Sequence, residues 1–96
     1  MFQTLADPTR RRIVETLRGA DAMAVSEIVK TVPIRQSGVS RHLHILQDAG
    51  FVDVHPVGTK RMYSLRPERF RELHQWADGY RTLWEARLDR FEAALS

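Results

Sequence analysis

The chain contains no cysteine, so disulfide bonds, thiolate metal sites and cysteine nucleophiles are all excluded. No apolar run approaches the roughly 20 residues that a membrane helix needs, and the N-terminus lacks the basic-then-apolar pattern of a secretory signal. Recognisable catalytic patterns are also missing: we find no nucleophile–base pair, phosphate loop or usefully spaced pair of carboxylates. We therefore expect a cytoplasmic protein that is not an enzyme and has no membrane anchor.

What is present is typical of a small globular protein. The 96 residues are 43% hydrophobic and 28% charged, which predicts one domain spanning residues 1–96. The net charge of +3 is unevenly placed, because residues 1–61 hold nine Lys/Arg against six Asp/Glu while residues 62–96 hold six of each. A basic excess favours contact with phosphate, although proteins that bind no nucleic acid often match a charge of this size.

Three helices are predicted in the first half of the chain. Asp7 and Pro8 supply an N-cap and a first helical residue, and Gly19 ends that helix, which a short helical turn precedes. The apolar spacing predicts a second, short helix at residues 23–32 and a third at about residues 36–49.

After Gly50 the apolar period changes from 3.6 to 2. Residues 51–55 and 61–65 predict a β-hairpin joined by the glycine-containing, basic segment 56–60. From Pro67 a long helix of about 27 residues, roughly 40 Å, runs close to the C-terminus. The predicted fold class is mainly α with a small β-hairpin, in the element order of a winged helix-turn-helix.

The third helix carries the strongest functional signal. Val39, Leu43 and Leu46 form an apolar stripe on one side, while hydroxyls, an Arg and a His occupy the other. A core-anchored helix with such a free face is what reading the major groove requires. Arg41 can bond both acceptors of a guanine, and short serines let the helix approach closely. An ordinary amphipathic helix with a solvated polar side is the alternative.

The hairpin tip adds cations beside this helix. Lys60 and Arg61 can contact the DNA backbone, unless the tip is simply a solvated turn. Arg35 stands where Ser or Thr would cap better, so either Arg35 binds phosphate or Ser37 caps a helix that begins later. The residues that we expect to contact DNA are Arg35, Gln36, Ser37, Ser40, Arg41, His44, Thr59, Lys60 and Arg61.

Three nearby features receive other interpretations. His42 flanks the apolar stripe, so we expect it to be partly buried and hydrogen-bonded rather than to read bases. The three arginines at residues 10–12 point in different directions on a helix, so at most one or two can face a single phosphate, and surface salt bridges are the favoured role. Gly38 costs the helix about 0.5–1 kcal/mol relative to Ala, which close approach of the backbone to DNA would explain.

The last helix, residues 66–96, carries a second signal and is predicted to be a dimerisation helix. Its apolar residues recur at spacings of three and four and include two Trp and a Tyr, which are enriched in interfaces. In a monomer such a helix would expose a large patch, unless it packs wholly against its own domain. We expect the dimer interface to comprise Phe2, Leu5, Leu73, Trp76, Ala77, Tyr80, Leu83, Trp84, Leu88 and Phe91.

Two residues interrupt this apolar stripe. Arg87 is expected to pair, across a dimer, with an acidic group such as Asp78 or Glu85. Gly79 is costly in the middle of a helix and predicts a close helix crossing or a kink.

Three motifs are typical of a known family: Ala-Asp-Pro-Thr-Arg at residues 6–10, Ser-Arg-His-Leu at residues 40–43 and Gln-Asp-Ala-Gly-Phe-Val at residues 47–52. With them the sequence resembles the ArsR family of bacterial transcriptional regulators. The aromatic positions of the last helix resemble a metal-independent branch, so the resemblance covers essentially the whole chain. It implies a homodimeric winged-helix repressor that binds an inverted-repeat operator.

The same resemblance shows what the chain lacks. Metal-sensing members carry a cysteine pair in or near the third helix, or paired His, Asp or Glu ligands on the last helix. This chain has no Cys and a single His74 in its tail, and neither Asp78 nor Glu85 completes a two-His spacing. We therefore expect no metal site and no cofactor.

The expected partner is palindromic double-stranded DNA, because a twofold dimer sets two reading helices roughly 34 Å apart. We expect a repressor that can act on its own promoter, and relief by protein concentration or a sequestering protein partner; activation stays open. Two other functions stay open as well. One is a winged-helix module that binds protein, and the other is a repressor that responds to metal through His and carboxylates.

Overall fold

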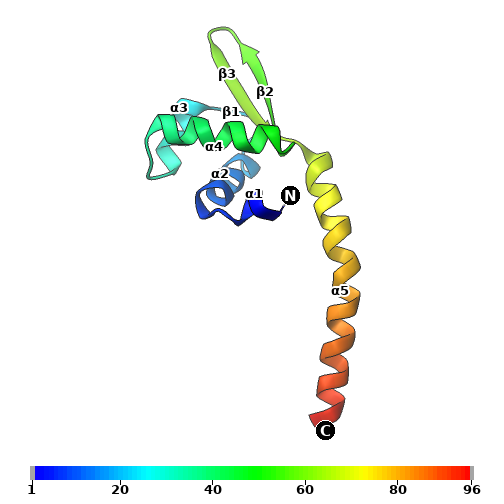
Figure 1. Ribbon diagram of the computed structural model, residues 1–96. Coiled ribbons are helices and arrows are strands. Elements are labelled where there is room, and N and C mark those ends of the chain that lie inside the picture. Colours follow the sequence, from blue (N-terminus) through cyan, green and yellow to red (C-terminus); the bar gives the residue numbers. More distant parts are fainter. Residues whose placement is uncertain (1, 96) are drawn as a thin grey trace.

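The structure, a computed structural model, describes residues 2–95. A small winged-helix body carries one long helix, α5 (Pro67–Leu95), that projects away from it (Figure 1). The molecule measures 63 × 26 × 21 Å, and its radius of gyration of 17.5 Å exceeds the roughly 13 Å of a compact chain of this length. Most of α5 therefore lies outside the body. No helix among residues 2–95 is both long enough and apolar enough to cross a bilayer.

The order of elements in the body agrees with the prediction of a mainly helical fold with a small sheet. The helical elements are α1 (Phe2–Ala6), α2 (Pro8–Arg18), α3 (Val25–Ile28), the short 3₁₀ helix η1 (Val29–Thr31) and α4 (Gln36–Asp48). The strands are β1 (Met23–Ala24), β2 (Val52–Val57) and β3 (Lys60–Leu65).

Helix α2 begins as the sequence predicts. The Asp7 carboxylate accepts hydrogen bonds from the backbone N–H groups of Thr9 (2.9 Å) and Arg10 (3.0 Å), and Pro8 takes the first helical position. The hydrogen bond from the Arg10 backbone lowers the pKa of Asp7 below its ordinary value of 3.8. The cap therefore stays charged at mildly acidic pH.

The core lies where α2 and α4 meet the sheet. Ile13 and Leu17 of α2 are buried against Leu43 and Leu46 of α4, and Phe51 closes the cluster. Each of these side chains is at most 1% exposed. Because α4 is anchored by the core on one side, its other side is held at the surface as a rigid face.

The sheet is larger than the predicted hairpin. Its antiparallel order is β1-β3-β2, and only Gly58 and Thr59 separate β2 from β3, in place of the predicted five-residue connection. Pro56 extends β2 without loss because β2 is an edge strand. The hairpin of β2 and β3, called the wing below, therefore has longer strands and a shorter tip than predicted.

The predicted helix at residues 23–32 is confirmed in part: it is wrong at its start, and its second half is a 3₁₀ helix. Met23 pairs with Tyr63 and Ala24 with Met62, so the segment begins as a third strand. A four-residue helix and the 3₁₀ turn follow, ending before Pro33. Strand pairing with β3 replaces the helix only at residues 23 and 24. Three valines and a threonine within residues 25–32 lower the helix propensity, which agrees with a helix that is short and tightens into a 3₁₀ turn.

Two glycines in helices have different surroundings from those predicted. A Cβ at Gly38 would lie 3.2 Å from Cδ1 of Ile34, so packing of Ile34 against α4 accounts for this glycine without DNA. A Cβ at Gly79 would meet nothing within 4 Å in the described residues, and α5 runs unbroken through that position. No other part of residues 2–95 crosses α5 at Gly79, so a close crossing there stays a prediction for the helix of a partner subunit.

Replacing Gly50 with Ala should destabilise the protein by about 1–2 kcal/mol, because Gly50 has a φ of +84° that an L-residue adopts at that cost. The change in the urea midpoint measures this effect. Gly19→Ala is the matched control, since Gly19 ends α2 at a φ of −82° and a Cβ there makes only an ordinary contact. Equal midpoints for the two variants would contradict the argument.

Candidate nucleic-acid interface

The exposed side of helix α4 borders the wing along one edge and is open to solvent along the other. It begins at Gln36, with Arg35 in the N-cap position at φ −68° and ψ 156°. The Arg35 side chain makes no capping hydrogen bond, and the Gly38 N–H donates to the Arg35 carbonyl at 3.0 Å. Of the first-turn N–H groups, those of Gln36 and Ser37 are therefore available to an anion. The alternative in which Ser37 caps a later helix is wrong, because Ser37 lies inside the first turn.

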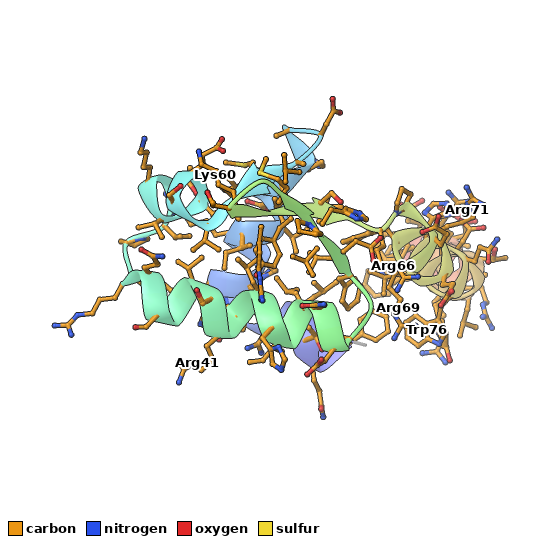
Figure 2. All side chains as sticks on the ribbon, turned by 90° about the horizontal axis from the view of Figure 1, so that it is seen from above. Arg41, Lys60, Arg66, Arg69, Arg71 and Trp76 are labelled. Carbon is orange, nitrogen blue, oxygen red and sulfur yellow. The ribbon has the colours of Figure 1, made fainter. Side chains whose placement is uncertain are left out.

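The predicted contact residues of α4 form two rows. Gln36, Ser40 and His44 line a cleft of about 450 Å³ that lies between α4, the start of α3 and the wing. Ser37 and Arg41 are exposed outside that cleft, and Arg41 extends from the side of α4 that faces away from the sheet (Figure 2). The row of Gln36, Ser40 and His44 therefore forms one surface with the wing, whereas the row of Ser37 and Arg41 belongs to α4 alone.

Gln47 belongs to the first row and was missed by the sequence analysis. It lies three residues after His44, at the helical spacing of the row, and lines the same cleft. The signal was present in the periodicity. An amide at this place can bond adenine in the same way that Arg41 can bond guanine.

A contact between a histidine and a carboxylate lies near the end of this face. His44 Nε2 lies 3.3 Å from Asp48 Oδ2, with both side chains about 70% exposed. The pair orients the His44 ring along α4. Because the Asp48 carboxylate repels phosphate, contact with the DNA backbone should be confined to the first three turns of α4.

The wing places its cations at the edge of the same cleft. Lys60 and Arg61 are exposed and line the cleft together with Tyr63, which is buried. Thr59 is exposed in the two-residue tip, where Gly58 adopts a φ of +64°. The structure thus brings Lys60 and Arg61 beside Gln36, Ser40 and His44, while Thr59 does not line the cleft. These cations can reach a phosphate while the helix face reaches base edges.

Within residues 2–95, the arginines at residues 10–12 form none of the surface salt bridges predicted for them. Arg10 Nε donates a 2.6 Å hydrogen bond to the Thr4 carbonyl, and its Nη1 lies 3.4 Å from His42 Nδ1. Arg12 Nε donates to the Thr31 carbonyl at 3.0 Å. Both side chains therefore brace the body by satisfying backbone carbonyls.

His42 has the structural role that was predicted. It is partly buried beside the core stripe of α4, and its ring nitrogen faces Arg10 of α2. This contact ties α4 to α2 and, through the Thr4 carbonyl, to α1. The reading face is thereby fixed relative to the N-terminal helices.

A second surface lies on α5. Phe2, Trp76 and Tyr80 stack in sequence, with ring centroids 4.4 and 4.5 Å apart. Beyond them the apolar side chains of α5 have no covering from the body and are 44–72% exposed. The exposed members of this face are Trp76, Ala77, Tyr80, Leu83, Trp84, Leu88, Phe91 and Leu95. The alternative in which α5 packs wholly against its own domain is therefore wrong.

Two residues assigned to the dimer interface lie partly inside the body. Leu5 and Leu73 are half-buried and pack against the core. They can contribute only their outer edges to an interface, so the free face begins at Trp76. The contact of Phe2 with Trp76 attaches α1 to the same face.

The acidic groups expected to pair with Arg87 are already engaged. Arg81 lies 3.0 Å from Asp78 and 4.0 Å from Glu85 within the same helix. Arg87 instead lines a shallow apolar groove with Tyr80 and Trp84. Its long aliphatic stem can cover apolar surface while its charge stays in water.

Neither surface offers a metal site. Among residues 2–95, no three His, Asp or Glu side chains lie close enough together to hold a metal ion.

Comparisons with known proteins agree with this geometry. Residues 5–55 match the helix-turn-helix domain family. The chain is 40% identical over 81 residues to the HTH-type transcriptional regulator Rv2034 of Mycobacterium tuberculosis, covering 84% of this chain and 75% of that protein. It is 33% identical over 76 residues to the transcriptional repressor SdpR of Bacillus subtilis, covering 79% and 83% of the two chains.

Solved structures extend the similarity to the fold. The crystal structure of the ArsR family transcriptional regulator RHA00566 superposes with a TM-score of 0.77 at 33% identity, covering 88% of this chain and 91% of that one. The homodimeric winged helix-turn-helix DNA-binding domain Mb0332 of Mycobacterium bovis superposes with a TM-score of 0.67 at 23% identity, covering 81% and 74%. These relatives are regulators rather than enzymes, as the sequence predicted. The chain belongs to the ArsR family of winged helix-turn-helix transcriptional regulators.

Proposed function

We propose that the protein is a homodimeric repressor that binds an inverted-repeat operator through α4 and the wing. The observation that carries the proposal is the placement of two unlike surfaces on one rigid body. One is the polar cleft shared by α4 and the basic wing, and the other is the uncovered apolar face of α5. The first surface fits DNA, and the second fits another copy of the chain.

The size and composition of the α5 face support pairing with itself. Monomeric proteins rarely expose a contiguous patch of this kind, and Trp and Tyr are the residues that interfaces favour. Residues 67–95 hold five Arg against six Asp/Glu, a net charge of −1, so the repulsion between two such helices is small. The Mycobacterium bovis domain is homodimeric, which supports the same arrangement.

A twofold dimer of this kind would present two α4 helices to one side of a duplex. Two reading helices one DNA turn apart, roughly 34 Å, match a palindromic site with half-sites on the same face. The repressor role is supported by the similarity to SdpR of Bacillus subtilis, which is a transcriptional repressor. A protein of the cytoplasm that occupies its own promoter would be an autorepressor. Its repression would be relieved by a change in its own concentration or by a sequestering protein.

The experiment is fluorescence anisotropy on duplex DNA from the region upstream of the coding sequence, against scrambled duplex, over a series of salt concentrations. Tight binding that survives competition, with two chains per site, is the expected result. Weak binding that salt removes equally from both duplexes would reduce the interaction to counterion release and exclude this operator. A protein that stays monomeric and binds neither duplex would favour the protein-interaction module.

A further inference from the structure

We propose that Arg69 is a positioning residue that fixes the angle between α4 and α5, and thereby the half-site spacing that the dimer accepts. This inference rests on the proposed function, because it takes α4 as the reading helix and α5 as the pairing helix. It adds a determinant of operator choice that touches neither the DNA nor the partner subunit.

Arg69 lies in the first turn of α5 and reaches back to the end of α4 (Figure 2). Its Nε donates a 3.0 Å hydrogen bond to the carbonyl of Ala49, the C-cap residue of α4. Its guanidinium carbon lies 5.5 Å from the centroid of the Phe51 ring, and its Nη1 lies 3.0 Å from Glu72 Oε2. One side chain therefore joins the end of the reading helix to the start of the pairing helix.

The contact with α4 is favourable for two reasons. The last carbonyls of a helix have no partner within it, and the helix dipole places negative charge at that end. The Arg69 guanidinium gives the Ala49 carbonyl a hydrogen-bond donor and places positive charge at the negative end of the helix dipole. Because the Arg69 side chain is only 30% exposed, water competes weakly for this hydrogen bond. The neighbouring pair of Arg66 and Asp53 is longer, at 3.5 Å, and about half exposed on both sides, so it contributes less.

Few other contacts set the direction of α5. Phe70 and Leu73 pack against the core, and Trp76 touches Phe2, all within the first ten residues of the helix. Apolar contacts of this kind are not directional and allow a helix to roll. A hydrogen bond to a carbonyl is directional. The 2.8 Å backbone bond from Arg66 to Phe51 fixes where the chain leaves the sheet, and Arg69 then fixes where the helix points.

A small change in the angle between α4 and α5 would produce a large displacement of the reading helices at the operator. A rotation of about 5° displaces a point roughly 20 Å along α5, about 13 residues at 1.5 Å each, by about 1.7 Å. Twofold symmetry applies the rotation to both subunits, so the separation of the reading helices can change by up to about 3.5 Å. This displacement is close to the rise of one base pair, about 3.4 Å.

The test measures affinity for duplexes that carry two half-sites at the native spacing, at one base pair fewer and at one more, and for a single half-site. The wild-type chain should prefer the native spacing by about 10-fold. Arg69→Met keeps the apolar stem but loses the donor and the charge, and should reduce the preference to less than about 3-fold. Its affinity for the single half-site should be unchanged.

Two further variants frame this result. Arg71→Met is the matched control, because Arg71 is exposed on the side of α5 away from α4 (Figure 2) and its loss removes the same charge. It should retain the wild-type spacing preference. Arg69→Lys keeps a charged donor without the planar fork and should recover part of the preference. Arg69→Lys also replaces Arg69→Met as the test variant if circular dichroism shows that Arg69→Met folds poorly.

Each contrary result has a separate meaning. An undiminished spacing preference in Arg69→Met would overturn the inference and leave the proposed function intact. So would an equal loss on the single half-site and the full site, because the damage would then lie in the reading surface. If the wild-type chain binds none of the duplexes, the proposed function fails and the inference fails with it.

Discussion

Arg41→Ala should lower the affinity for the operator by about 5- to 150-fold and relax the preference for one sequence, since a bidentate contact with guanine contributes about 1–3 kcal/mol. Arg41 is exposed on the outer row of α4, extends away from the sheet and has no role in the core (Figure 2). Its removal should therefore leave the stability of the fold unchanged. Anisotropy titrations against the operator and against single-base variants of it measure both effects.

Lys60→Ala separates sequence reading from phosphate binding. Lys60 lies at the wing tip and is expected to contact the DNA backbone, so its loss should weaken all duplexes to a similar extent. The slope of log affinity against log salt should fall by about one in magnitude. If both variants bind the operator as the wild type does, α4 and the wing are not the interface.

The elements that the sequence predicted well have local signals. The cap at Asp7 with Pro8, the stripe of α4 and the glycine at residue 50 each determine structure within one or two turns. The long amphipathic pattern of α5 is equally local. Such features can be predicted because the residues that cause them are neighbours in the chain.

The features that were missed depend on contacts between distant residues. Met23 becomes part of a strand only because Tyr63 is beside it, 40 positions later. Arg10 and Arg12 bond carbonyls of α1 and η1 whose proximity no spacing rule reveals. The Arg69 contact with Ala49 is of the same kind.

The interface itself was predictable in part. Periodicity identified the free face of α4, because the apolar stripe of Val39, Leu43 and Leu46 marks the side that the core buries. It could not show that the wing covers one edge of that face and leaves Arg41 on the other, since this depends on where β3 lies against α4. The split into two rows is thus a property of the tertiary structure.

Trp84→Glu should convert the protein to a monomer, with a rise in the dimer dissociation constant of about 1,000-fold. Trp84 is 62% exposed and contributes nothing to the core of its own subunit, so the fold should survive. An interface Trp typically contributes about 2 kcal/mol or more, and a twofold interface loses it twice, giving about 4 kcal/mol. Sedimentation equilibrium measures the dissociation constant directly.

Thr82→Glu is the matched control for charge. It adds the same carboxylate to the same helix, but Thr82 lies two positions before Trp84 and therefore on nearly the opposite side of α5. This variant should remain dimeric with wild-type affinity. A dimeric Trp84→Glu would show that the apolar face of α5 serves some other partner.

The loss of the dimer should reach the DNA. A dimer engages two half-sites at once, and the second contact is made at a high effective concentration. The Trp84→Glu monomer should therefore bind a full operator only as tightly as a single half-site, whereas the wild type should bind the full site far more tightly. Because Arg41 and Lys60 are untouched in this variant, such a result would assign the difference to pairing through α5 alone.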